Sequence, residues 1–290
     1  MLESSVEFLR CIRCDSKLEL EIFRYNKEIE EGFLECSNCK LLFPIIEKIP
    51  ILWNDFSNYL YFRKVLGGKL YQSINSLKLK NFLKSSLSPS SKSTDDRTAL
   101  ETRWSNIYQN SKGSKFYSQI KKNIIDLPRS KLVLEYGCSI GTITSVLADY
   151  NDMVFGIDTS FSALSIAKKS SKQNLDYILA DSLSPIFGKL QFDLIFALNL
   201  LELIEPSDLL NHISQQISHG YFIISDPYDF DRGDNSVRKP LDELTLRTNL
   251  ENLGFKISPK TKNPSFITWN LKLNSRATLN YKVDLVITTK

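Results

Sequence analysis

The chain has 290 residues, of which 42% are hydrophobic, which is enough for one large domain and one small one. Its formal net charge of +4 is too low to indicate a nucleic-acid partner by itself. The longest apolar stretch, 192–204, is too short to span a bilayer, and the N-terminus lacks the apolar core of a secretory signal. We therefore expect a cytoplasmic protein with no membrane partner.

Four of the five cysteines form two C-x-x-C pairs near the start of the chain, Cys11 with Cys14 and Cys36 with Cys39. Paired cysteines at this separation are typical of a closed, tetrahedral structural zinc site. A reducing compartment disfavours the alternative of two disulfides. Residues 18–23 and 32–35 are predicted as short strands, so residues 1–54 are expected to form a small β-rich domain that zinc stabilises.

After Cys39 the chain contains the steps Phe43-Pro44-Ile45 and Ile49-Pro50-Ile51-Leu52. Together with the four cysteines, these steps resemble the zinc-ribbon activator subunit of tRNA, rRNA and release-factor methyltransferases, and related ribbons fused to other methyltransferases. Lys48 stands where that family often has glycine. The resemblance implies that the ribbon serves a catalytic domain in the same chain, and it leaves room for a protein partner at the ribbon. A purely structural ribbon is the alternative.

Residues 55–98 are predicted to connect the ribbon to a catalytic domain. The segment 56–85 reads as one or two helices with a break at Gly67-Gly68, and the serine-rich stretch 85–98 reads as a flexible linker. From 56 to 94 there are lysines and arginines but no acid, and aromatic residues are interleaved with them. Such a surface could bind RNA. We favour an amphipathic connector with solvated lysines, because the net charge is low.

Residues 99–290 are predicted to form the catalytic domain. A helical pattern over 100–125, interrupted near Gly113, precedes a short apolar run at 132–134 that is typical of a buried parallel strand. Glu135 ends the run, Gly137 and Gly141 follow, and 142–150 has a helical pattern. A strand, a glycine turn and a helix in this order open a nucleotide-binding, doubly wound α/β sheet.

Two further apolar runs end in acids that could meet a nucleotide. The run 153–157 is followed by Asp158, which is placed to accept hydrogen bonds from ribose hydroxyls, and the run 175–180 is followed by Asp181, which could meet an adenine edge. A Rossmann dehydrogenase is the alternative, but its G-x-G-x-x-G turn is missing, because three residues separate the first two glycines where that motif has one, and no third glycine follows in the helix.

This series resembles the class I S-adenosylmethionine-dependent methyltransferases over about 132–225. Ser139 stands where that family often has a third glycine. The resemblance implies an α/β Rossmann-like fold, S-adenosylmethionine as the cofactor, and a set of cofactor contacts. The candidate contacts are Glu135, Gly137, Cys138, Gly141, Asp158, Asp181 and Asn199.

The rest of the chain should complete the sheet and supply the acceptor site. We expect a strand over 192–199, a helix that begins at Glu205-Pro206, a strand over 220–225, a helix over 240–252 and two antiparallel strands within 255–290, the last over 281–288. The loop 226–234 and the segment 263–276 are expected to line the acceptor. The candidate acceptor contacts are Asp226, Tyr228, Phe266, Trp269 and Arg276.

Residues and motifs that are missing from the sequence disfavour some classes of methyl acceptor, but they identify neither the acceptor nor a catalytic residue. All five cysteines have other assignments, so a cysteine nucleophile for cytosine C5 is disfavoured. The Asn/Asp-Pro-Pro-Tyr/Phe motif of amine methyltransferases is missing after the fourth strand. We therefore favour a small molecule or peptide as the acceptor. RNA is the runner-up, since rRNA guanine methyltransferases have a similar order of domains. A non-catalytic scaffold is disfavoured, because the Gly137, Gly141 and Asp158 set is intact.

Overall fold

A computed structural model describes residues 1–87, 96–170, 172–231 and 236–290. These residues divide into two compact units. Unit 1 comprises 1–106, 139–141 and 157–188, and unit 2 comprises 107–138, 142–156 and 189–290. The predicted serine-rich linker at 85–98 and the predicted loop at 226–234 each lie partly outside the described residues.

Unit 1 begins with a four-stranded antiparallel sheet in the order β1-β2-β3-β4. Its strands are β1 (Leu18–Asn26), β2 (Glu28–Cys36), β3 (Leu42–Ile46) and β4 (Ile49–Pro50). The first hairpin pairs Leu18 with Cys36 and reverses at Lys27, which has φ of 61°. The predicted short strands at 18–23 and 32–35 are thus longer in the structure, and the sheet fits a small zinc ribbon.

The connector folds into three helices, α1 (Phe56–Tyr61), α2 (Lys64–Ser73) and α3 (Leu77–Ser86). The prediction of one or two helices with a break at Gly67-Gly68 is wrong, because both glycines lie inside α2. Side-chain caps define two of the starts instead: Asp55 accepts from the Asn58 N–H and Ser76 from the Leu79 N–H. Gly67 has a packing role, since a Cβ there would lie 2.5 Å from Leu87 Cδ2.

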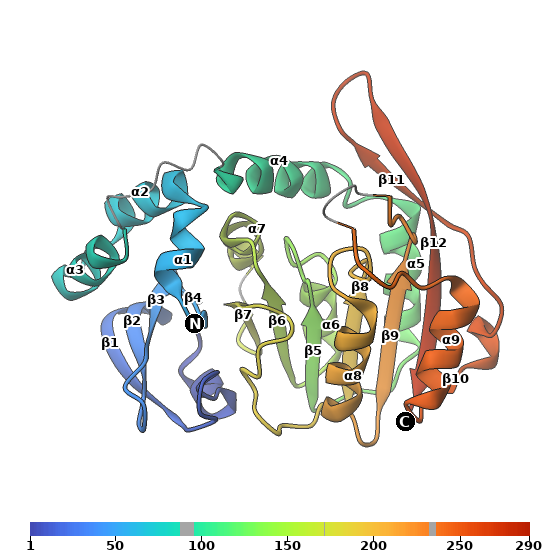
Figure 1. Ribbon diagram of the computed structural model, residues 1–290, viewed down its shortest axis with the longest axis horizontal. Helices are drawn as coiled ribbons and strands as arrows, with labels where there is room; N and C mark the ends of the chain where they lie inside the picture. The colour runs from blue at the N-terminus through green and yellow to red at the C-terminus, as the bar shows by residue number, and fades with distance from the viewer. Residues whose placement is uncertain (88–95, 171, 232–235) are drawn as a thin grey trace. The chain divides into compact units, whose positions relative to one another are not determined.

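Within unit 1 the ribbon continues the larger sheet at its edge strand, β7 (Leu175–Leu179) (Figure 1). Ile51 forms a parallel bridge with Leu179, and the Leu52 N–H donates to the Leu179 carbonyl at 2.8 Å. The Arg10 N–H donates to the Ile186 carbonyl at 2.7 Å. An uncovered edge strand can pair with other chains, so the ribbon protects this edge.

A buried ion cluster ties the ribbon to the same part of unit 1. The Lys168 ammonium lies 2.5 Å from Glu28 on β2 and 2.7 Å from Asp176 on β7. The Ser5 hydroxyl donates to Asp176 at 2.6 Å. Buried charges are expensive unless they are paired, so this cluster fixes the ribbon against β7 in a single arrangement.

The larger sheet is mixed, with the strand order β10-β12-β9-β8-β5-β6-β7, and β11 pairs with β12. The pairs β5–β8 and β8–β9 are parallel, whereas β9–β12 is antiparallel. Its remaining strands are β5 (Leu132–Tyr136), β6 (Met153–Asp158), β8 (Leu194–Leu198), β9 (Tyr221–Asp226), β10 (Lys256–Ile257), β11 (Ile267–Lys272) and β12 (Thr278–Thr289). The predicted α/β Rossmann-like fold class is therefore confirmed.

After the connector, the described residues contain the helices α4 (Arg97–Asn110), α5 (Lys115–Ile125), α6 (Thr144–Tyr150), α7 (Phe161–Ala167), α8 (Pro206–Gln216) and α9 (Glu243–Asn252). The interruption near Gly113 separates α4 from α5 as expected. In unit 2, α5 and α6 lie on one face of the strands and α8 and α9 on the other (Figure 1). No helix in the described ranges is both long and apolar enough to cross a membrane.

The C-terminal segment differs from the prediction of two strands. It forms three strands, and β12 is longer than the predicted 281–288. Residues 284–289 pair with β9, whereas 278–283 pair with β11. The far end of this second pairing projects past β9 as a hairpin (Figure 1). One long strand can therefore both close the sheet and carry β11 toward α5.

Candidate functional site

The glycine turn after β5 has a backbone that only small residues allow. Gly137 and Gly141 have φ of 62° and 69°. A Cβ at Gly137 would lie 2.4 Å from Leu200 Cδ2, and a Cβ at Gly141 would lie 2.3 Å from the Tyr177 hydroxyl oxygen. Both glycines are therefore required by conformation and by space.

Ser139, between the two glycines, also lies in the left-handed region, with φ of 50°. This conformation costs a non-glycine residue about 1–2 kcal/mol. The Ser139 N–H donates to Asp158 Oδ2 at 2.8 Å. Ser139 thus has the backbone conformation that favours glycine, the residue often found here in the methyltransferases that the sequence resembles. Its N–H also links the turn to the end of β6.

Asp158, the last residue of β6, is held by backbone donors on both carboxylate oxygens. Oδ1 accepts from the Ser160 N–H at 2.8 Å, while Oδ2 accepts from Ser139. Burial raises the pKa of Asp158 to about 6, although these hydrogen bonds act in the opposite direction. A carboxylate has about four acceptor positions. Asp158 could therefore accept further hydrogen bonds from a pair of hydroxyls.

The other predicted cofactor residues lie at strand ends in their own units. In unit 2, Glu135 is buried and accepts from the Thr144 hydroxyl, and Cys138 is buried beneath the turn, where a Cβ on Gly156 would lie 2.9 Å from its sulfur. Asn199 has φ of 58°, and its Oδ1 accepts from the Ser225 hydroxyl at 3.0 Å. In unit 1, the exposed Asp181 accepts from the Leu183 N–H at 2.8 Å.

Aromatic rings from α4, α5, β11 and β12 gather around Trp269 in unit 2. Trp269 stacks parallel to Tyr108 with ring centroids 6.1 Å apart, and its ring also lies 5.5 Å from Phe116 and 5.7 Å from Tyr281. Within the described part of the chain, the buried Trp269 Nε1 has no hydrogen-bond partner. Buried polar atoms normally have one, so this cluster is a candidate ligand site.

The aromatic cluster extends toward the end of β5 through Tyr117. Burial raises the pKa of the Tyr117 hydroxyl, and Tyr108 and the Glu135 carboxylate raise it further. Glu135 lies in β5, two residues before Gly137 of the glycine turn. The rings around Trp269 therefore continue to the residue that the sequence places beside the cofactor.

The structure does not bring together the five residues predicted to contact an acceptor. Asp226 is fully buried, and its carboxylate accepts from the backbone N–H groups of Leu201 at 2.9 Å and Tyr228 at 2.8 Å, so its role in substrate contact is corrected to a structural one. Phe266 is 69% exposed. Arg276 lies in the turn between β11 and β12 and is exposed.

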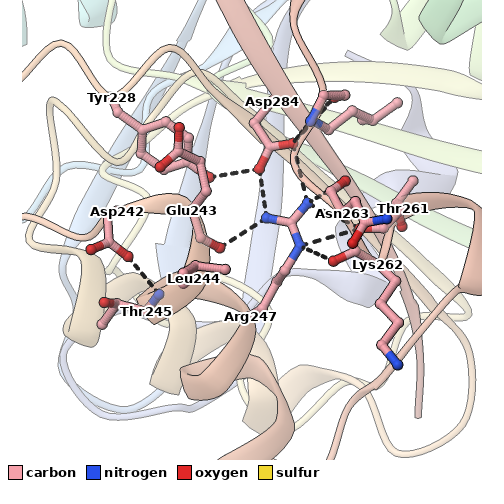
Figure 2. Close-up of polar contacts among 12 residues, drawn as sticks. Tyr228, Asp242, Glu243, Leu244, Thr245, Arg247, Thr261, Lys262, Asn263 and Asp284 are labelled. Atoms are coloured by element: carbon pink, nitrogen blue, oxygen red, sulfur yellow. Dashed lines mark hydrogen bonds and ion pairs between the residues drawn. The ribbon is translucent and has the colours of Figure 1, made fainter.

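The fixed cation of this region is Arg247 on α9, which the sequence analysis missed (Figure 2). Arg247 donates to both carboxylate oxygens of Asp284, at 2.7 and 3.2 Å, and to the backbone carbonyls of Glu243 and Thr261. The Tyr228 hydroxyl donates to Asp284 at 2.9 Å. Asp284 was the one sequence signal that could have indicated this pair. It stands between Val283 and Leu285 in the last strand, and a carboxylate buried among apolar residues needs a charged or polar partner.

The four ribbon cysteines form the cysteine cluster that the sequence predicted. Their sulfur atoms all lie within 4.8 Å of one another, with Cys11 and Cys39 separated by 3.5 Å and Cys14 and Cys36 by 3.4 Å. A tetrahedral zinc with bonds of about 2.3 Å needs sulfurs about 3.8 Å apart. The Cys39 N–H also donates to Cys36 Sγ at 3.3 Å. These residues fit a closed structural zinc site, in which no position is left for catalysis.

Comparisons with known proteins agree with this arrangement. Residues 133–219 match a family model described as a methyltransferase domain. No curated protein matches the chain. One similar solved structure is a complex between the Haloferax volcanii Trm112 methyltransferase activator and a methyltransferase. It has 13% identity and a TM-score of 0.52, and the match covers 67% of this chain and 95% of that one.

Other similar structures have lower TM-scores. The magnesium protoporphyrin IX methyltransferase of Synechocystis PCC 6803, with bound S-adenosylmethionine, has 17% identity and a TM-score of 0.49, with coverage of 69% of this chain and 100% of that one. The N-methyltransferase NodS of Bradyrhizobium japonicum WM9 has 17% identity and a TM-score of 0.47, with coverage of 60% and 96%.

The family match and the shared fold support an S-adenosylmethionine-dependent methyltransferase domain. At these identities the structural similarity concerns the fold. The acceptor has to be inferred from the residues around the site.

Proposed function

We propose that this protein transfers a methyl group from S-adenosylmethionine to a small molecule or peptide. The observation that supports the cofactor most strongly is the Asp158 carboxylate at the end of β6. The N–H groups of Ser139 and Ser160 orient it beside the glycine turn, and part of its acceptor capacity is still available.

The turn and the strand ends fit this cofactor. The backbone of residues 137–141 would approach the methionine part, and Leu200 and Tyr177 pack against Gly137 and Gly141 and support the turn. Asp158 would accept from the ribose, and Asp181 would meet the adenine. When bound, the cofactor supplies a methyl group that its sulfonium has already activated. The protein then has chiefly to align a nucleophile with it.

Residues of unit 2 would surround the reacting end. Glu135 belongs to β5, Cys138 is the second residue after β5, and Asn199 directly follows β8. Tyr108 or Tyr117 could cover the methionine end. The cluster around Trp269 offers apolar walls with one hydrogen-bond donor, the Nε1–H, that has no partner in the described part of the chain. Such walls suit a compact acceptor with an apolar or aromatic body and an oxygen or nitrogen that accepts from this donor.

RNA is the second candidate acceptor, and contacts in the connector argue against it. Lys78 pairs with Glu21 at 2.6 Å, Lys80 lies over the ring of Tyr71 at 5.9 Å, and Tyr59 is buried. These contacts are those of a connector that packs against its own unit. The exposed Tyr61 and Tyr71 retain the combination of rings and nearby lysines that could stack on bases.

Two measurements test the proposal. Calorimetry with S-adenosylhomocysteine should show binding, whereas a protein that ignores this ligand and binds NAD would contradict the cofactor assignment. Turnover is then measured with a metabolite extract and, separately, with total RNA. We expect turnover with the extract.

The RNA arm uses the triple variant Lys78→Glu, Lys80→Glu and Lys84→Glu. A matched control applies the same charge change to the exposed Lys256, Lys260 and Lys262 of unit 2. RNA-dependent turnover that collapses in the first variant and survives in the second would replace the small-molecule proposal with the RNA one.

A further inference from the structure

Glu101 on α4 has a half-buried side chain, and its ion-pair partner uses only one of the two carboxylate oxygens. Arg63 donates from both Nε, at 2.9 Å, and its NH2 group, at 2.7 Å, to the same oxygen, Oε1. Glu101 Oε2 is buried and has no hydrogen-bond partner in the described ranges. An arginine fork commonly engages both carboxylate oxygens. This pair instead holds Glu101 in place and leaves Oε2 available.

Arg63 is fixed and can therefore position Glu101. Its side chain is 8% exposed, its NH1 group donates to the Tyr59 carbonyl at 3.2 Å, and its guanidinium lies over the Tyr59 ring at 4.0 Å from the centroid. The Tyr59 hydroxyl donates to the carbonyl of Thr159 at 3.0 Å. Thr159 follows Asp158 directly. A continuous series of contacts within unit 1 thus links Glu101 to the end of β6.

A second contact fixes α4 against the same segment. The hydroxyls of Thr102 and Ser162 are hydrogen-bonded at 3.2 Å, and Ser162 lies in the first turn of α7, just after Asp158. Thr102 is the neighbour of Glu101 in α4. The side chains of Glu101 and Thr102 therefore both make contacts that hold α4 close to the segment after Asp158.

The charges of the two carboxylates interact. Burial is the main cause of the raised pKa of Asp158, and the negative charge of Glu101 adds to it. Burial also raises the pKa of Glu101, against the opposing effect of Arg63. A negative charge close to a buried acid disfavours its ionisation, so the Glu101 carboxylate is an unfavourable neighbour for the Asp158 carboxylate. A ligand with two neighbouring hydroxyl donors would relieve this repulsion and satisfy Oε2.

We propose that Glu101 is a second ribose-binding carboxylate. Its Oε2 accepts from one hydroxyl of the ribose diol and Asp158 accepts from the other, while Arg63 is a positioning residue. This inference rests on the proposed use of S-adenosylmethionine. It also gives Arg63, which lies in the predicted connector 55–98, a role in positioning a residue of the cofactor site.

The test compares three ligands by calorimetry: S-adenosylhomocysteine and its 2′-deoxy and 3′-deoxy analogues. Glu101→Gln removes the charge of the acceptor with little change in shape. We expect it to weaken binding of S-adenosylhomocysteine by about tenfold or more, the scale of a hydrogen bond to a charged group. It should weaken binding much less for the one deoxy analogue that lacks the hydroxyl contacted by Glu101.

A matched control is Glu19→Gln, which makes the same change at an exposed residue of the ribbon and should bind all three ligands like the wild type. Where Glu101→Gln does not fold, Glu101→Asp serves in its place. It keeps the charge that pairs with Arg63 and withdraws the carboxylate by one methylene, so the same selective loss is expected.

The outcomes separate this inference from the proposed function. A wild-type protein that does not bind S-adenosylhomocysteine overturns both. Normal wild-type binding combined with an unchanged affinity in the Glu101 variant overturns the second carboxylate alone. An equal loss for all three ligands also overturns it, because that pattern indicates general damage to α4 and not a missing hydroxyl contact.

Discussion

Leu52, just after the last strand of the ribbon, donates its N–H to the carbonyl of Leu179 on β7 at 2.8 Å. This hydrogen bond and the adjacent Ile51–Leu179 bridge make the ribbon a continuation of the edge of the larger sheet. Asp158 belongs to the same unit. Folding of the ribbon and order at the cofactor site are therefore expected to be coupled.

Zinc removal should consequently weaken cofactor binding as well as the ribbon. We expect about one zinc per chain in the purified protein and a loss of both zinc and S-adenosylhomocysteine affinity in Cys36→Ser, since such ribbons depend on metal to fold. Elemental analysis and calorimetry measure the two effects. Cys138→Ser is the control for zinc content, because this cysteine lies outside the cluster. Less than about half a zinc per chain in carefully prepared protein would contradict the site.

Asp158→Ala should reduce the affinity for S-adenosylhomocysteine by about 2–3 kcal/mol, because hydrogen bonds to a charged acceptor are lost. Calorimetry at pH 8, where the carboxylate is ionised, gives the cleanest value. Asp181→Ala offers a comparison at an exposed strand end, and a smaller loss is expected there. Equal affinities of Asp158→Ala and the wild type would show that the ribose is bound elsewhere.

The affinity for the cofactor should also depend on pH through Asp158. Burial raises the pKa of Asp158 to about 6, and hydroxyl donors favour the ionised form. The affinity should therefore fall as the pH decreases through about 6. In the free protein the sign is opposite: the raised pKa favours the folded state at low pH, and this stabilisation is lost as the pH rises through 6. Calorimetry from pH 5 to 8 with Asp158→Asn, which should give a flatter curve, tests this dependence.

The sequence predicted the regular parts of the fold because each depends on local signals. Apolar runs located β5 through β9, and the glycines at 137 and 141 located the turn, since both signals act over a few residues. The paired cysteines predicted their own cluster for the same reason. The predicted helix break at Gly67-Gly68 failed because glycine's low helix propensity is a weak local preference that tertiary packing can override, and at Gly67 the packing against Leu87 leaves no room for a Cβ.

The site residues that could not be predicted from the sequence have partners that are distant in the chain or are backbone groups. Arg276 was predicted as an acceptor contact because it lies near the aromatic residues in the sequence, whereas Arg247 contacts Asp284 only through the packing of α9 on the closing strand. Asp226 follows an apolar strand, as a ligand-binding acid often does, yet its oxygens are occupied by nearby backbone donors. Glu101 has no local motif, and only the fold brings it near Asp158.

Ser139→Gly should stabilise the protein. Ser139 holds a left-handed conformation that costs a residue with a Cβ about 1–2 kcal/mol, and glycine removes this cost while adding freedom to the unfolded chain. The net gain should be up to about 1 kcal/mol in the free energy of unfolding. Urea denaturation measures it. Ser139→Ala keeps the Cβ and should show no gain, so a gain of equal size in alanine would exclude backbone strain as the cause.

Arg247→Ala should be among the most destabilising single changes in unit 2. It leaves the Asp284 carboxylate buried without its cation, for which a loss of about 3–5 kcal/mol is expected. Arg276→Ala removes the same type of side chain from an exposed turn and should change stability by less than about 0.5 kcal/mol. Comparable losses in the two variants would show that the buried pair has no special role.

The pH dependence of stability gives an independent test of the same pair. Burial alone would raise the pKa of Asp284, but hydrogen bonds from Arg247 and Ser265 outweigh it and hold this pKa below its ordinary value. The contribution of Asp284 is therefore fully present above the pKa of the unfolded chain, about 3.9, and is lost as the pH falls through the lower, folded-state pKa. Denaturation curves of the wild type from pH 7 to pH 3 should show this acid-side loss. Asp284→Asn should lower stability at neutral pH and reduce the acid-side dependence, whereas an unchanged dependence would assign the acid sensitivity to other carboxylates.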